Sequence, residues 1–175
     1  RARVVHGANT PLGNQVTAAL ERFTWLADLP ADAHAMTLDM RRRMEEHAPK
    51  GHLKQGSGGL LDVEFAVQWL QLKHGREVKA VRCPGVLEAI EALSGCGAVD
   101  AAAASDARDS YLFLRSVENR LQVVDGKPCE LVPQAGAELE VLARRMGMDG
   151  ESPAQTLLKR LEEARKSNRE FYRSV

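Results

Sequence analysis

Residues 54–68, KQGSGGLLDVEFAVQ, form the segment of this sequence that decides its fold. Three glycines allow a tight turn, and the residues that follow have the apolar spacing of an amphipathic helix. We expect this helix to cover about residues 59–73, with Val63, Val67 and Leu70 facing the core. The segment therefore predicts a helix at the centre of a helical domain.

The rest of the sequence consists of apolar segments with helical spacing, separated by glycine and proline. No repeat, low-complexity tract or linker divides it, and almost no alternating strand pattern occurs. We therefore expect an all-α fold, an antiparallel bundle of about six to seven helices. The further helices are expected at about residues 11–28, 32–47, 84–94, 99–125, 136–146 and 153–174.

Composition excludes several functional classes. The chain has 175 residues, which is the usual size of a single domain. Its 24 basic and 24 acidic residues give a formal net charge of zero, and the basic residues are spread along the chain, which argues against a nucleic-acid partner. No apolar run reaches the roughly 18 residues that a membrane span needs. We expect a cytoplasmic protein without a membrane partner.

A basic run, Arg41-Arg42-Arg43, stands in the second predicted helix and is followed by Glu45 and Glu46. Basic and acidic side chains at this spacing usually form ion pairs on a solvated helix face. We therefore expect the run to be exposed, and a phosphate-binding or partner-facing role is the alternative.

The glycine turn is a candidate phosphate site. Backbone amides of Gly56, Gly58 and Gly59 at a helix start are suited to bind an anion, and Lys54 precedes them. The run is neither a Walker A loop nor a dinucleotide fingerprint. Asp62 lies in the first turn, where a carboxylate stabilises the helix; the alternative is that it orients the turn toward a nucleotide.

Glu64 follows Asp62 by two residues, about 200° around a helix, so the two carboxylates do not share a face. Glu64 instead shares a polar stripe with Gln68 and Gln71 on an otherwise apolar helix, so we expect it to be partly buried. A buried carboxylate needs a partner or a proton. An interhelical ion pair and an active-site edge are the two hypotheses, and the expected interhelical network contains Arg115, Glu118, Asn119 and Arg120.

Local motifs for metal binding or catalysis are absent from the sequence. It has no H-E-x-x-H, no C-x-x-C and no G-x-S-x-G. It also lacks the D-x-D pattern on a strand that would hold Mg²⁺ against a triphosphate. We therefore expect neither a metal site nor a catalytic residue in this chain.

Three blocks, in order, resemble glutamine synthetase adenylyltransferase, the bifunctional enzyme that adds AMP to glutamine synthetase and removes it. Residues 58–68 match its GG-x-x-D-[IV]-E-F-x-x-Q signature, residues 111–122 resemble Y-x-F-L-R-x-[VI]-E-[NH]-R-L, and residues 142–147 resemble a third block. Residues 1–7 are similar to the R-A-R-x-V-x-G segment that closes the family's nucleotidyltransferase domain. The resemblance implies that residues 1–10 are the tail of that domain and that residues 11–175 form one helical bundle.

The resemblance further implies an accessory role in adenylyl transfer, with a preference for the C-terminal half of the enzyme. ATP and Mg²⁺ would be held mainly by the preceding domain, and the partners would be glutamine synthetase and the PII signalling protein, with glutamine as a regulator. Ser57 departs from the family, where proline is common. A PII uridylyltransferase-like enzyme and a non-catalytic binding or sensor module are the alternatives. The residues expected to line the cleft or approach the nucleotide are Lys54, Gly58, Gly59, Asp62, Glu64 and Gln68.

Overall fold

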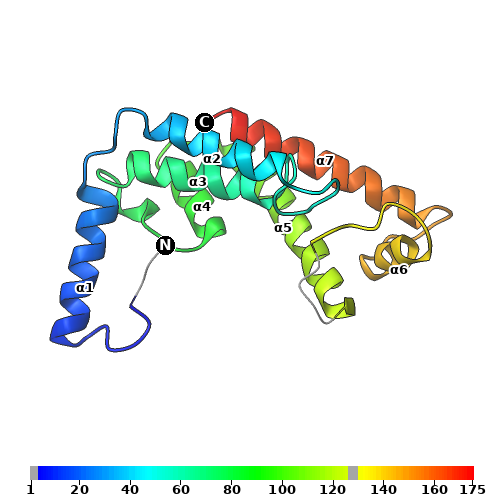
Figure 1. Ribbon diagram of the computed structural model, residues 1–175, viewed down its shortest axis with the longest axis horizontal. Helices are drawn as coiled ribbons and strands as arrows, with labels where there is room; N and C mark the ends of the chain where they lie inside the picture. Colours follow the sequence, from blue (N-terminus) through cyan, green and yellow to red (C-terminus); the bar gives the residue numbers. More distant parts are fainter. Residues whose placement is uncertain (1–3, 126–129) are drawn as a thin grey trace.

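The computed structural model describes residues 4–125 and 130–175, which form seven α-helices and no sheet (Figure 1). The prediction of an all-α fold is confirmed. The expected helix boundaries agree with the observed ones, except that the first helix changes at Arg22 into a π-helical turn, η1 (Arg22–Leu26). The helices are α1 (Pro11–Glu21), α2 (Ala33–Glu46), α3 (Leu60–His74), α4 (Val86–Gly95), α5 (Ala101–Asp125), α6 (Ala137–Arg145) and α7 (Pro153–Arg173).

Helix α3 is the centre of the molecule, and α2, α4, α5 and α7 pack around it. Val63, Val67 and Leu70 are buried, as the apolar spacing predicts. Asp62 in the first turn and Lys73 and His74 in the last turn place opposite charges at the two ends of the helix dipole. The apolar spacing and the charges at the two ends thus both favour a helix at the position of α3.

Helix α7 returns along the bundle and packs against α3, α5 and α6 (Figure 1). Leu157, Leu161, Ala164 and Phe171 repeat at helical spacing and are buried. Helix α7 contacts the first turn of α3 through Arg169 and the middle of α5 through Arg160, which lies over the Phe113 ring.

Helix α1 and η1 form an arm that projects from one end of the bundle (Figure 1). The arm contacts the rest of the molecule through a few side chains. Trp25 lies against Gly75, whose added Cβ would be only 2.6 Å from the indole ring, and Glu21 pairs with Arg82. Apolar side chains of the arm are largely uncovered, since Leu12 is 69% and Phe23 82% exposed.

A buried charge cluster joins α2, the glycine turn, α3 and α7. Arg41 and Asp62 are both 0% exposed, and Arg41 Nη2 lies 2.5 Å from Asp62 Oδ1. Arg41 Nη2 also donates to the carbonyl of Gly56 at 2.9 Å. From α7, Arg169 Nη1 lies 3.0 Å from Asp62 Oδ2 and 2.9 Å from Glu45 Oε2.

The expectation that the basic run is a solvated face is therefore wrong for Arg41 and correct for its two neighbours. Arg42 and Arg43 are exposed and pair with Asp39, and Arg42 also pairs with Glu46. The helical repeat separates them, because adjacent residues point about 100° apart. Arg41 points inward, where Asp62 compensates its charge.

We expect Arg41→Met to lower the free energy of unfolding by about 3–5 kcal/mol, because it leaves Asp62 buried with only part of its compensation. The measurement is urea denaturation followed by circular dichroism. Arg42→Met is the matched control, since this neighbour has the same side chain on the exposed side of the helix, and it should leave stability nearly unchanged. Equal losses for the two variants would contradict the assigned role of Arg41.

We expect Gly58→Ala to be more destabilising than its backbone angle alone predicts. Gly58 has a φ of +67°, and a Cβ there would lie 2.0 Å from the backbone carbonyl oxygen of Arg165 in α7. Gly97→Ala isolates the conformational cost, because Gly97 has a φ of +77° with nothing within 4 Å of an added Cβ. The conformational cost alone is about 1–2 kcal/mol. A loss for Gly58→Ala no larger than for Gly97→Ala would show that α7 does not need this close approach.

Candidate functional site

The glycine turn does not offer its amides to a phosphate. Within the turn, Gly56 N donates to His52 O and Gly59 N donates to Gly56 O, both by backbone hydrogen bonds. At the start of α3, Leu60 N donates to Leu53 O and Leu61 N donates to Lys54 O, each at 3.0 Å. Anion binding at a helix start requires unsatisfied amides, whereas in this structure these amides are bonded within the chain.

The amide and the carbonyl of Gly58 are also hydrogen-bonded within the chain. Gly58 N donates to Asp62 Oδ2 at 2.9 Å, and Asn168 Nδ2 donates to Gly58 O at 3.2 Å. Gly58, Gly59 and Asp62 are buried under α7. Gly58 is needed because the backbone of α7 lies too close for a side chain, and Gly56 and Gly59 because carbonyls of the turn itself do. Asp62 accepts the hydrogen bond of Gly58 N and thereby stabilises the turn.

The charge of Asp62 affects the pKa values of three side chains on α7. Burial opposes the charged form of Arg169, but Asp62 and Glu45 together hold the pKa of its guanidinium above the ordinary value. Burial lowers the pKa of Arg165, and the charge of Asp62 only partly offsets this. Burial and the negative charge of Asp62 raise the pKa of the Tyr172 phenol. Asp62 is thus the anion around which this end of α7 is arranged.

Glu64 lies on another face of α3, half-buried against α5. Its Oε1 accepts a hydrogen bond from the hydroxyl of Tyr111 at 3.0 Å. Arg115, one helical turn after Tyr111, lies over the Tyr111 ring at 5.7 Å and donates to Glu118 at 2.6 Å. Burial opposes the charge of Arg115, yet Tyr111, Glu118 and Glu64 hold the pKa of its guanidinium above the ordinary value.

The expected interhelical network is therefore only partly correct. Arg115 interacts with Glu64 only through its charge, whereas Tyr111 donates the hydrogen bond to Glu64. Asn119 and Arg120 are exposed, and no hydrogen bond or ion pair joins either to another described residue. Arg120 points about 180° away from Tyr111 around α5, and Asn119 lies about two helical turns beyond Tyr111.

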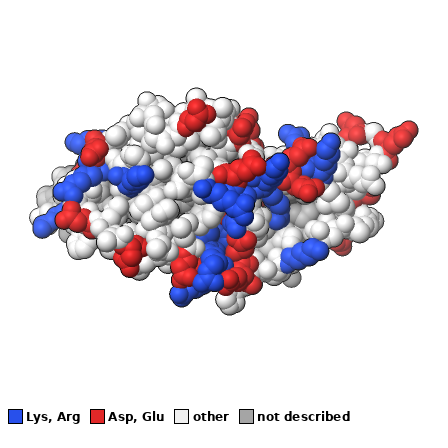
Figure 2. Space-filling model, turned by 90° about the horizontal axis from the view of Figure 1, so that it is seen from above, with Lys and Arg blue, Asp and Glu red and all other residues white. Residues whose placement is uncertain are grey.

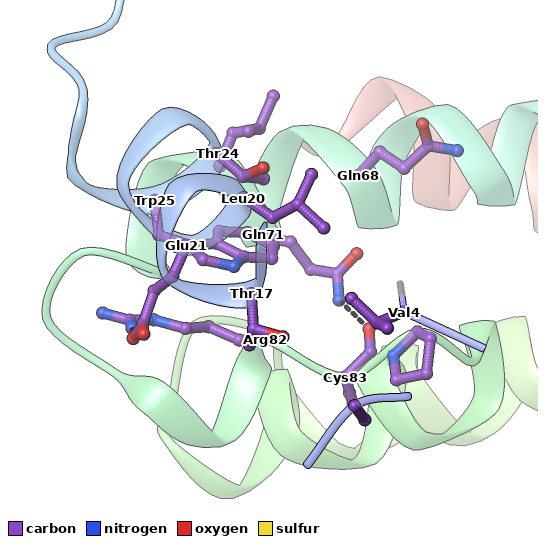
Figure 3. A pocket seen from close by; sticks show the side chains of 13 residues that line it. Val4, Thr17, Leu20, Glu21, Thr24, Trp25, Gln68, Gln71, Arg82 and Cys83 are labelled. Carbon is purple, nitrogen blue, oxygen red and sulfur yellow. Dashed lines mark hydrogen bonds and ion pairs between the residues drawn. The ribbon is translucent and has the colours of Figure 1, made fainter. Parts of the chain in front are cut away.

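The polar stripe of α3 continues from Glu64 to a pocket between α3 and the arm. Gln68 is exposed at this pocket, and Gln71 is buried beneath it (Figure 3). The pocket has a volume of about 630 Å³, and residues of α1 and η1 form one wall. Glu64 and Gln68 thus lie on one side of α3, whereas Gly58, Gly59 and Asp62 are buried at its start. Lys54 is half-buried beside the turn.

The described residues show no centre for a metal ion. Within residues 4–125 and 130–175, no group of three or more His, Cys, Asp or Glu side chains is placed to hold one. With the glycine amides also occupied, these residues do not fit a Mg²⁺–triphosphate group.

Over the same residues, no helix has the length and apolar character needed to cross a bilayer. On the face that carries α2 and α7, charges of both signs are intermixed (Figure 2).

Sequence reasoning missed the residues that complete these clusters. Arg169 and Asn168 lie more than 100 residues from the turn that they contact, so no local pattern links them. For Tyr111 a signal exists, because it begins the second family-like block and lies four residues before Arg115. Its spacing placed it on the face of α5 that reaches Glu64.

Comparisons with known proteins agree with the resemblance. A model of the family described as GlnD PII-uridylyltransferase matches residues 33–175. A bifunctional glutamine synthetase adenylyltransferase/adenylyl-removing enzyme of Streptomyces coelicolor is 41% identical over 155 residues, which cover 85% of this chain and 15% of that protein. The enzyme of the same name from Mycobacterium tuberculosis H37Rv is 38% identical over 176 residues, which cover 96% of this chain and 17% of that protein.

The matched region is thus a small part of each relative and corresponds here to an all-helical unit. High coverage of this chain, identity near 40% and the family-model match point to the same group of proteins. The chain belongs to the family of the bifunctional glutamine synthetase adenylyltransferase/adenylyl-removing enzymes, in a helical region that it shares with the PII-uridylyltransferase model.

Proposed function

We propose that this chain is the helical accessory domain of an enzyme that adenylylates glutamine synthetase. In this role it packs against a nucleotidyltransferase domain and completes one wall of its cleft. The names of the relatives support the activity, and the short matched region, 15% and 17% of two relatives, supports an accessory part. Because the glycine amides of this chain are already hydrogen-bonded, we expect ATP and Mg²⁺ to be held by the preceding domain. This chain alone is then inactive.

The observation that carries the proposal is the uncovered arm, whose residues up to Leu20 carry no charge. Residues 7–20 contain no Asp, Glu, Lys, Arg or His, although 27% of the chain is charged. Solvent-facing helices normally carry charge, and exposed apolar patches mark interaction surfaces. Leu12 and Phe23 on this arm are therefore best explained as contacts with a further domain.

The position of the arm connects that interface to the polar stripe of α3. Arm residues and Gln68 line the same pocket, and Glu64 lies one turn before Gln68 on α3. A domain seated on the arm would therefore meet Glu64 and Gln68 at its edge. In the proposed arrangement residues 1–10 are the tail of that domain, and residues 1–3 lie outside the described ones.

The proposed partners are glutamine synthetase and PII, and the proposed compartment is the cytoplasm. Within the enzyme, the chain is proposed to belong to the C-terminal half.

A second candidate is a PII uridylyltransferase-like enzyme. It is favoured by the family model, whose description names that activity and which covers residues 33–175. The two candidates differ in the nucleotide transferred and in the target protein. Intact-mass analysis of glutamine synthetase and of PII, each incubated with ATP or UTP, separates them.

We expect the complete enzyme to add AMP to glutamine synthetase in the presence of ATP and Mg²⁺, and this chain alone to add none. Leu12→Lys should lower AMP incorporation by the complete enzyme, because it places a charge in the interface. In this chain alone the same substitution should leave the free energy of unfolding nearly unchanged, since Leu12 is exposed. Intact-mass spectrometry of glutamine synthetase measures the first effect and urea denaturation the second. Full activity of the Leu12→Lys enzyme would contradict the interface.

We expect Glu64→Ala in the complete enzyme to lower turnover by about tenfold or more, as misplacement of a cleft wall does. The melting temperature should fall by only about 2–4 °C, the effect of one hydrogen bond in a domain of this size. Glu163→Ala, which removes an exposed carboxylate of α7, is the control and should change neither quantity. Parallel losses of turnover and melting temperature for Glu64→Ala would assign Glu64 to stability alone.

A further inference from the structure

The pocket between the arm and α3 has the size and composition of a small-molecule site. Its volume of about 630 Å³ is within the range of ligand pockets. The arm contributes Leu20 and Trp25 (Figure 3). The body contributes Leu72 and Pro84. These side chains give the pocket a mainly apolar wall on both sides.

One polar group in the pocket has a fixed direction. Gln71 is only 3% exposed, and its Nε2 donates to the carbonyls of Val81 at 2.6 Å and Cys83 at 2.8 Å. These two hydrogen bonds fix the orientation of the amide, so Oε1 points away from Cys83 (Figure 3). No described residue donates to this Oε1, which leaves an accessible acceptor at the pocket wall.

The charges at the pocket are already compensated. Arg82 pairs with Glu21, and its Nε donates to Gly75 O at 2.6 Å. Its Nη2 donates to Arg76 O at 3.2 Å. No unpaired charge remains among the lining residues to attract an ion. A ligand gains most here by covering apolar surface and by donating one hydrogen bond to Gln71.

We propose that this pocket binds an uncharged, largely apolar small molecule that carries one N–H donor, which it directs at Gln71 Oε1. Such a ligand contacts the arm through Leu20 and Trp25 and the body through Leu72. Binding therefore fixes the arm against the bundle. This inference concerns the chain by itself and does not depend on the proposed adenylyl transfer.

Indole is the probe, because it is flat, apolar and carries one N–H. Benzofuran is the matched control compound, since it has the same shape with a ring oxygen in place of the N–H. In a titration of the ¹⁵N-labelled chain followed by heteronuclear NMR, indole should give saturable shifts of the amides of Gln71, Leu72 and Cys83. Benzofuran should bind about tenfold more weakly, the factor that corresponds to the loss of one hydrogen bond.

Two variants localise the binding. Leu20→Trp fills the pocket and should abolish the indole shifts, whereas Leu12→Trp places the same side chain on an exposed position of the same helix and should preserve them. Absence of saturable shifts up to the solubility of indole would overturn the site. Equal affinity for indole and benzofuran would overturn recognition through Gln71, and binding by Leu20→Trp equal to that of the wild type would overturn the location.

Discussion

The contact between Arg41 and Asp62 is the interaction on which the rest of the structure depends. Two fully buried opposite charges are separated by 2.5 Å, and each needs the other because an uncompensated buried charge costs several kcal/mol. Asp62 fixes the first turn of α3, Arg41 brings α2 and the Gly56 carbonyl to it, and Arg169 adds α7. Four separate segments of the chain therefore meet at one carboxylate. The net stabilisation from such a cluster is small, because the desolvation of its charges offsets much of their attraction.

In this arrangement the first turn of α3 and its later residues have different roles. Its first turn is enclosed, with the glycine amides and both oxygens of Asp62 bonded within the chain. Glu64, held by Tyr111, and Gln68, at the arm pocket, lie on a different side that remains partly accessible. The segment that matches the family signature thus contains two kinds of residue. The glycines and Asp62 build the domain, and the later polar residues are those available for contact with another domain or a ligand.

Much of this fold is predictable from local chemistry, and the charge cluster is not. Helix ends follow from glycine, proline and charged residues near each terminus, and the core of α3 follows from Val63, Val67 and Leu70. The burial of Arg41 does not follow, because the sequence shows only three successive arginines and the partner lies 21 residues away. The hydrogen bonding of the glycine amides does not follow from the sequence either, for a related reason. A glycine turn before a helix looks the same in sequence whether its amides are open or bonded to distant segments.

Native-state hydrogen exchange of the amides at the start of α3 tests the central claim most directly, which is that the glycine turn is a closed structural device. The account predicts that the amides of Gly59, Leu60 and Leu61 exchange about as slowly as those of Val67 in the core, and that inorganic triphosphate does not change their rates. Fast exchange that triphosphate suppresses would show an open anion site and would contradict the account.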